Sequence, residues 1–104
     1  MFYVTTEEIK GYSIKKVLGI VKGSSVRAKW IGADISAGIK NLFGGEISEY
    51  SKLLEESREQ AIDRMLKDAE QLGANAIVGV RFMTSQIGQQ AAEILVYGTA
   101  VIAE

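Results

Sequence analysis

Three carboxylates flank a pair of glycines near the middle of the chain: Asp34, Glu46 and Glu49, around Gly44-Gly45. Carboxylate oxygens are the ligands that hard cations such as Mg²⁺ and Ca²⁺ prefer. We therefore take these three carboxylates as candidate metal ligands, with a divalent cation as the only cofactor. The alternative is that these carboxylates interact favourably with the positive, N-terminal end of a helix dipole and otherwise face solvent.

The glycine pair precedes a predicted helix, and backbone N–H groups at such a position can bind phosphate or another anion. Glu46 and Glu49 would repel an anion there, and the Gly-Lys-Ser/Thr sequence of a P-loop is absent. We therefore interpret Gly44 and Gly45 as a tight structural turn. Gly73, at the end of the same predicted helix, is interpreted in the same way.

The chain contains no cysteine and no histidine. This excludes disulfides, thiolate catalysis and any Cys/His metal site, and it removes the commonest general base near neutral pH. The Ser24-Ser25 pair has no histidine to activate it as a nucleophile, so we interpret it as a turn that ends a strand. No catalytic residue is predicted, and the chain is not expected to be an enzyme.

The composition is that of one folded domain, residues 1–104, with 47% hydrophobic and 24% charged residues and a net charge of -1. This balance gives no electrostatic reason to expect nucleic acid, so the loose basic cluster of Lys22, Arg27 and Lys29 is interpreted as solvated surface. No signal peptide and no apolar stretch of about 20 residues is visible, which predicts no membrane contact and a cytoplasmic location.

Hydrophobic periodicity predicts the elements that must position these residues. Strands are expected at residues 13–22, 74–86 and 91–103, with a short β-prone run at 2–5. The first long strand should end at Gly23-Ser24-Ser25, and the last two strands should pair as a hairpin.

Two helices are expected between these strands. Apolar residues every fourth position from Ile31 to Phe43 predict a short or irregular helix, and a clear apolar face predicts a long helix over residues 48–72 with Ser48 as its N-cap. The fold class is therefore α+β, with a small antiparallel or mixed sheet of three to four strands, one long helix and one short helix.

Both faces of the last predicted strand are largely apolar, as are those of the strand before it. One long helix covers only one face of such a sheet, and large exposed apolar patches normally mark an interface. We therefore expect a homo-oligomer, with Trp30, Tyr50, Leu95 and Tyr97 as candidate residues of the interface or of a small-molecule pocket. The alternative is a monomer whose short helix folds across the second face.

Three motifs together resemble a known family: Gly44-Gly45 followed by Tyr50, "LGANAIVGV" at residues 72–80, and "GTAV" at residues 98–101. The chain resembles the YbjQ family, also called UPF0145 or DUF74, whose members carry the label "putative heavy-metal-binding". The resemblance covers nearly the whole chain. It implies an α+β fold with subunits assembled into a ring, a pentamer, and it implies no established activity.

The chain departs from the pattern of this family at charged positions. Asp34 lacks the arginine that accompanies it in many relatives, Glu46 stands where arginine is frequent, and Arg81 and Phe82 replace acidic residues. The leading hypothesis is a non-enzymatic, homo-oligomeric scaffold or small-ligand binder with a site between subunits. An oxygen-ligand metal-binding protein is the alternative, and an enzyme of unknown reaction is the third.

Overall fold

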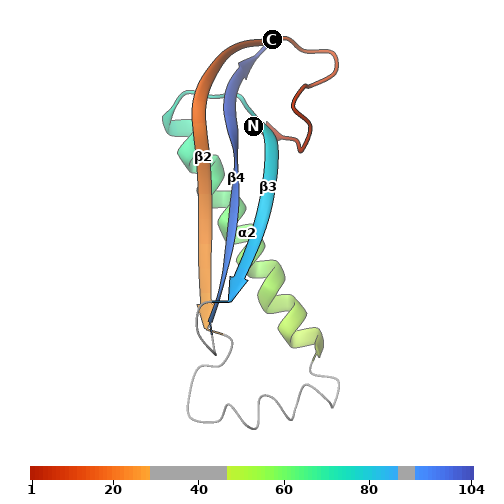
Figure 1. Cartoon of the computed structure of the whole chain (residues 1–104), viewed down its shortest axis with the longest axis vertical. Helices are drawn as coiled ribbons and strands as arrows, with labels where there is room; N and C mark the ends of the chain where they lie inside the picture. Colours follow the sequence, from red (N-terminus) through yellow and green to blue (C-terminus); the bar gives the residue numbers. More distant parts are fainter. Residues whose placement is uncertain (29–46, 87–90) are drawn as a thin grey trace.

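The computed structural model describes residues 1–28, 47–86 and 91–104 (Figure 1). Its elements in chain order are β1 (Phe2–Tyr3), β2 (Ile14–Ala28), α2 (Ile47–Gln71), β3 (Ala76–Gln86) and β4 (Ala91–Ala103). The strands form one mixed sheet in the order β1-β3-β4-β2, in which β1 runs parallel to β3 and the other neighbours are antiparallel. The α+β class and the antiparallel pairing of the last two strands are confirmed. The predicted short helix, from Ile31 to Phe43, lies outside the described residues.

The strand β2 does not end at the predicted turn but continues through Gly23-Ser24-Ser25 to Ala28. The reason is a close approach of α2. A Cβ atom at Gly23 would collide with the backbone carbonyl of Ala61 and the backbone amide of Met65. This glycine therefore lets the helix lie against the strand, and the prediction of a turn at this position was wrong.

The strand β3 contains a bulge at Gly79, where φ is 63° and the register with β4 shifts between Val78 and Arg81. Glycine tolerates this positive φ, and the extra residue reverses the alternation of side chains. Val80 consequently packs in the core under α2, whereas Val78 packs on the opposite face of the sheet. Uninterrupted alternation along this strand would predict that Val78, Val80 and Phe82 share one face, and this prediction was wrong for Val78.

The helix α2 already includes Ile47, so Ser48 lies inside it and is not its N-cap. Its C-terminal end is followed by Gly73, which adopts a φ of 81°. The N–H of Gly73 donates to the carbonyl of Glu70 at 3.0 Å, and the N–H of Ala74 donates to the carbonyl of Ala69 at 3.1 Å. These bonds satisfy carbonyls of the last turn, as a left-handed helix end requires.

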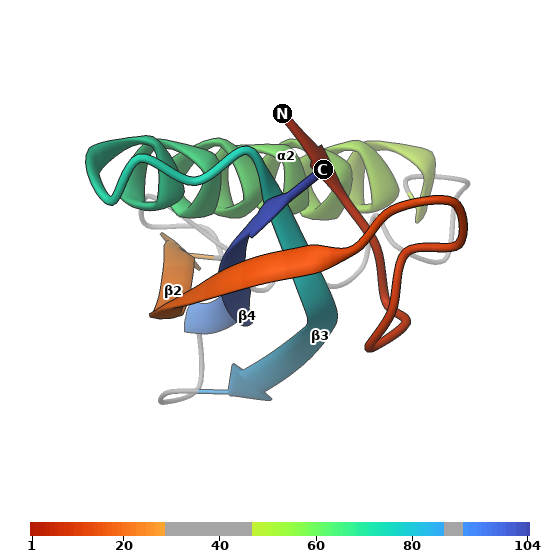
Figure 2. The same cartoon turned by 90° about the horizontal axis from the view of Figure 1, so that it is seen from above.

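The main hydrophobic core lies between α2 and the two strands β2 and β4. It contains Val21, Ala61, Ile62, Met65, Ala69, Ile77, Val80, Ile94, Val96 and Ala100. Figure 2 shows that α2 lies along one side of the sheet while β3 curves away from it. As a result Phe82, which pairs with Val96 and shares its side of the sheet, remains 46% exposed.

A second, smaller core lies on the opposite face, beneath the N-terminal segment. It contains Ile9, Ala76, Val78, Val101 and Ala103, with Val4 and Ile14 packed against it. The carbonyl of Val4 accepts the N–H of Val80 at 3.0 Å, and Ser13 and Glu104 exchange backbone hydrogen bonds at 2.8 and 2.9 Å. The N-terminal segment thus covers part of the face for which only the short helix had been considered.

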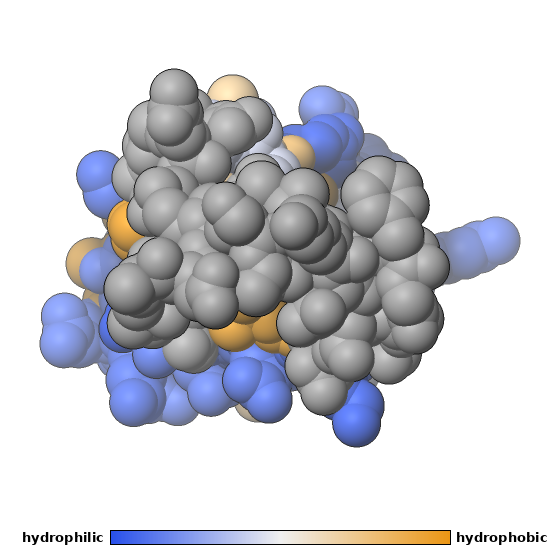
Figure 3. Space-filling model, turned by 90° about the horizontal axis from the view of Figure 1, so that it is seen from below, coloured by the Kyte–Doolittle hydropathy of each residue, from blue (hydrophilic) through white to orange (hydrophobic). Residues whose placement is uncertain are grey.

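The rest of that face is uncovered in the described part of the chain, and we call it the open face. Its large apolar residues are Val17, Ile20, Val26, Met83, Leu95 and Tyr97. The end-on view from below also shows hydrophobic surface in orange beside charged residues in blue (Figure 3). In the described part of the chain, α2 packs against one face of the sheet, whereas the N-terminal segment covers only part of the other.

Candidate functional site

Half of the ten residues proposed from the sequence lie outside the described residues: Trp30, Asp34, Gly44, Gly45 and Glu46. Glu49 and Tyr50 lie in the first turn of α2, where the structure describes the backbone alone. The carboxylate site and the glycine turn therefore stay predictions.

Leu95 and Tyr97, the remaining candidates, lie on β4 and are half-buried on the open face. Leu95 pairs with Met83 of β3, and Tyr97 lies between Lys22 of β2 and Arg81 of β3. Side chains directly opposite each other on neighbouring strands share a face of the sheet. The structure therefore groups these two candidates with an apolar neighbour and two cations.

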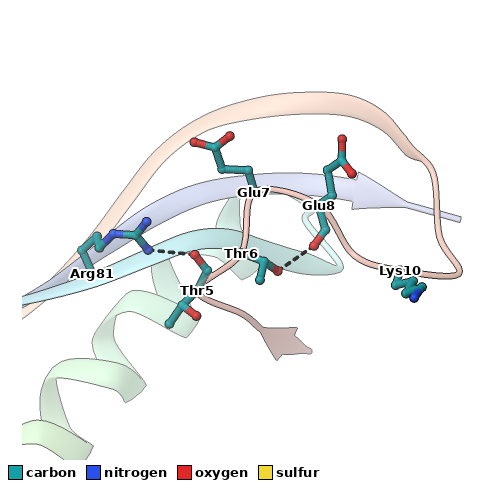
Figure 4. A pocket seen from close by; sticks show the side chains of 6 residues that line it. All are labelled: Thr5, Thr6, Glu7, Glu8, Lys10 and Arg81. Carbon is teal, nitrogen blue, oxygen red and sulfur yellow. Dashed lines mark hydrogen bonds between the residues drawn. The ribbon is translucent and has the colours of Figure 1, made fainter.

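An open hollow lies where the N-terminal segment meets β3 (Figure 4). Its lining consists of Thr5, Thr6, Glu7, Glu8, Lys10 and Arg81. Nη1 of Arg81 donates to the carbonyl of Thr5 at 2.8 Å and to the carbonyl of Val80 at 2.9 Å. The guanidinium therefore ties the N-terminal segment to the strand, a role that sequence reasoning missed.

The other groups around this hollow do not converge on a reactive centre. The hydroxyl of Thr6 donates to the carbonyl of Glu8 at 2.6 Å, so its proton is already engaged. Figure 4 draws no hydrogen bond between Arg81 and the carboxylate of either Glu7 or Glu8. Without a base positioned against a hydroxyl, this arrangement supports a structural contact and no acyl or phosphoryl transfer.

A second polar cluster lies along the outer edge of β2. It consists of Lys22, Arg64, Lys67, Asp68 and Gln71. Oδ2 of Asp68 accepts the backbone N–H of Lys22 at 3.1 Å, and Nη1 of Arg64 donates to the carbonyl of Ser24 at 2.6 Å. Arg64 and Asp68 are four residues apart on the predicted helix, so they lie on the same side of it. This spacing is the sequence signal that could have indicated their shared contact with β2.

Two serines are buried between α2 and β2. The hydroxyl of Ser25 donates to Oε1 of Gln60 at 2.8 Å, so Ser25 is a packing residue with its proton committed to an amide. Ser57 is 2% exposed, and its hydroxyl has no hydrogen-bond partner among the described residues. A buried hydroxyl without a partner costs free energy, which makes Ser57 a weak point of the helix–sheet contact.

The described residues contain no group of three or more Cys, His, Asp or Glu side chains arranged to hold a metal ion. Among the same residues, no helix is long and apolar enough to cross a membrane.

Comparison with known proteins gives a consistent relationship. A family model described as "Putative heavy-metal-binding" matches residues 1–104. A UPF0145 protein of Methanosarcina acetivorans is 55% identical over 101 residues, which are 97% of this chain and 95% of the relative. A UPF0145 protein of Thermus thermophilus is 55% identical over 97 residues, covering 93% of this chain and 85% of the relative.

One solved structure extends the comparison to the fold. It is a protein of unknown function from Pediococcus pentosaceus that belongs to the DUF74 family. The TM-score is 0.70, with 18% identity and coverage of 100% of this chain and 98% of the other. At this identity the likeness supports the fold alone.

Proposed function

Because the chain belongs to the UPF0145 family of uncharacterised function, also called YbjQ, we propose that it is a non-enzymatic homo-oligomer, a scaffold or small-ligand binder. Its ligand site lies between subunits. The open face is the observation that carries this proposal, because association is the chemistry that this surface offers.

The open face is too apolar for a surface that stays in water. Ile20 is 78% exposed and Val17 is 65% exposed, and Val26 and Met83 are each more than half exposed. Burial of apolar surface is worth about 25 cal/mol per Å², so covering these four side chains contributes several kcal/mol. A second copy of the same chain can cover this face, so no other protein is needed for it.

The shape of the chain also supports association. Its Cα radius of gyration is 17.1 Å, with extents of 53 × 22 × 16 Å. A compact chain of this length has a radius of gyration of about 13 Å. An elongated protomer with an exposed apolar face is typical of a subunit, which completes its core in an assembly.

The proposed assembly is a ring, in keeping with the pentamer that the family resemblance implies. Two different apolar surfaces favour a head-to-tail arrangement: the open face, and the side of β3 around Phe82 that α2 does not cover. A contact between two different surfaces of identical subunits closes into a ring when the rotation allows it. Leu95 and Tyr97 would then line a pocket between neighbours.

A hard-cation site is the second candidate, because the description of the family model names metal binding and this chain offers carboxylates but neither cysteine nor histidine. A ring would repeat Glu49, in the first turn of α2, around its axis together with the other proposed carboxylates, Asp34 and Glu46. Carboxylates repeated in this way can bind Mg²⁺ or Ca²⁺. Calorimetric titration with both ions tests this candidate, and no heat of binding from either ion contradicts it.

Light scattering at micromolar concentration tests the assembly. We expect a mass several times the 11.3 kDa of one chain, and a reduced mass for Ile20→Lys. Leu72→Lys is the matched control, because it places the same charge on an exposed leucine beyond the end of α2. A wild-type protein with the mass of a single chain would refute the proposal. Native mass spectrometry of the purified assembly then identifies any retained small molecule.

A further inference from the structure

We infer that this chain has no built site for thiophilic heavy metals, such as Zn²⁺, Cd²⁺, Hg²⁺ and Cu⁺, although the description of its family names heavy-metal binding. The first ground is the inventory of donor atoms. The 104-residue sequence contains no cysteine and no histidine. Thiolate and imidazole are the ligands that hold these ions tightly, and carboxylate oxygens alone suit harder cations.

Assembly into a homo-oligomer does not change this inventory. Identical subunits multiply the donors that one chain has, and they add no donor of a new type. For Zn²⁺, Cd²⁺ and Hg²⁺ the inference therefore holds for a monomer and for a ring alike, and it does not depend on the proposed function.

The described carboxylates do not form a cluster that could replace the missing thiolate and imidazole ligands. No three of them are arranged to hold a metal ion within the described ranges, and Asp68, which lies on α2, already accepts the backbone N–H of Lys22. An isolated carboxylate on a solvated surface keeps its hydration and binds a divalent ion weakly. The described residues thus offer no preformed oxygen cage for these ions.

Methionine thioether is the one soft donor in the chain, which has three methionines. Met65 is fully buried in the core beneath α2, where no ion can reach its sulfur without disrupting the packing. Met1 and Met83 are exposed, one before β1 and one on β3. Met83 lies on the open face, so copies of it meeting at an interface between subunits are the route to a Cu⁺ site that the test has to exclude.

The test measures metal directly on the intact protein. Elemental analysis of protein purified from zinc-supplemented medium, and competition titrations with Zn²⁺ and Cd²⁺ against a chromogenic chelator, are expected to give far less than one ion per chain. The double variant Glu55→His with Glu59→His is the positive control. It places two imidazoles four residues apart on the exposed side of α2, where they are expected to gain Zn²⁺ binding.

Two results would overturn the inference. One is retention of about one Zn²⁺ or Cd²⁺ per wild-type chain against the chelator. The other is stoichiometric Cu⁺ binding under reducing conditions that disappears in Met83→Leu. Light scattering on the same samples reports the oligomeric state separately, so a failure of this inference is distinguishable from a failure of the proposed assembly.

Discussion

The carboxylate of Asp68 on α2 accepts the backbone N–H of Lys22 on β2 at 3.1 Å. The guanidinium of Arg64, one turn earlier on the helix, donates to the carbonyl of Ser24 at 2.6 Å. Unpaired backbone groups on a sheet edge are a template for pairing with other strands. Two helix side chains therefore occupy the part of the β2 edge that would otherwise invite such pairing.

Loss of the hydrogen bonds that Asp68 and Arg64 make with the backbone of β2 should weaken the fold and expose the outer edge of this strand. We expect Asp68→Ala to lower the free energy of unfolding by about 1 kcal/mol, because one partly exposed hydrogen bond to a charged group is lost. The double variant with Arg64→Ala should in addition aggregate more readily on storage. Urea denaturation and time-resolved light scattering measure the two effects. Lys67→Ala, an exposed neighbour on α2, is the control, and an equal loss in that variant would contradict the capping role.

A side chain at Gly23 should separate α2 from the sheet. We expect Gly23→Ala to destabilise the fold by about 3 kcal/mol or more, because its Cβ meets the backbone of Ala61 and Met65 and no flexible side chain can yield. Thermal denaturation followed by circular dichroism measures the loss.

Gly73→Ala separates this steric effect from an effect on backbone conformation. At Gly73 no atom lies within 4 Å of an added Cβ, and the penalty comes only from the positive φ of 81°. The cost of such a conformation is about 1–2 kcal/mol. A Gly23→Ala variant as stable as Gly73→Ala would show that the helix does not approach the strand as closely as described.

Replacing Ser57 should be neutral or stabilising. Its buried hydroxyl has no partner among the described residues, so Ser57→Ala removes a desolvated polar group and is expected to raise the free energy of unfolding by up to about 1 kcal/mol. Ser25→Ala is the matched comparison, because it removes a hydroxyl that donates to Gln60 and should cost about 1 kcal/mol. Chemical denaturation measures both, and a marked loss in Ser57→Ala would reveal a hidden partner for this hydroxyl.

The elements with strong local patterns were predictable from the sequence. The bounds of β4 are those expected, and α2 is displaced by one residue at each end. Both are long segments whose periodicity is set by their own residues. Prediction failed at Gly23, because glycine followed by two serines is a turn signal within its own segment. Its real environment is created by Ala61 and Met65, about forty residues later in the chain.

The candidate site shows the same division between local and distant causes. Leu95 and Tyr97 could be assigned to a shared face by alternation alone, and the structure places them together on the open face. The contact of Arg81 with Thr5 could not be foreseen, because no residue pattern indicates that the N-terminal segment folds back along β3. Nor could periodicity indicate that this segment would bury Val78 and Val101.

Because of the bulge at Gly79, the alternation of side chains along β3 is reversed from one side of this residue to the other. Before it, odd-numbered Ile77 lies on the helix side of the sheet; after it, even-numbered Phe82 does, and Met83 lies on the other side. An uninterrupted strand alternates in a single phase, so it could not place both Ile77 and Phe82 on the same side. The extra residue at this glycine therefore allows both halves of β3 to turn an apolar side chain towards one side of the sheet.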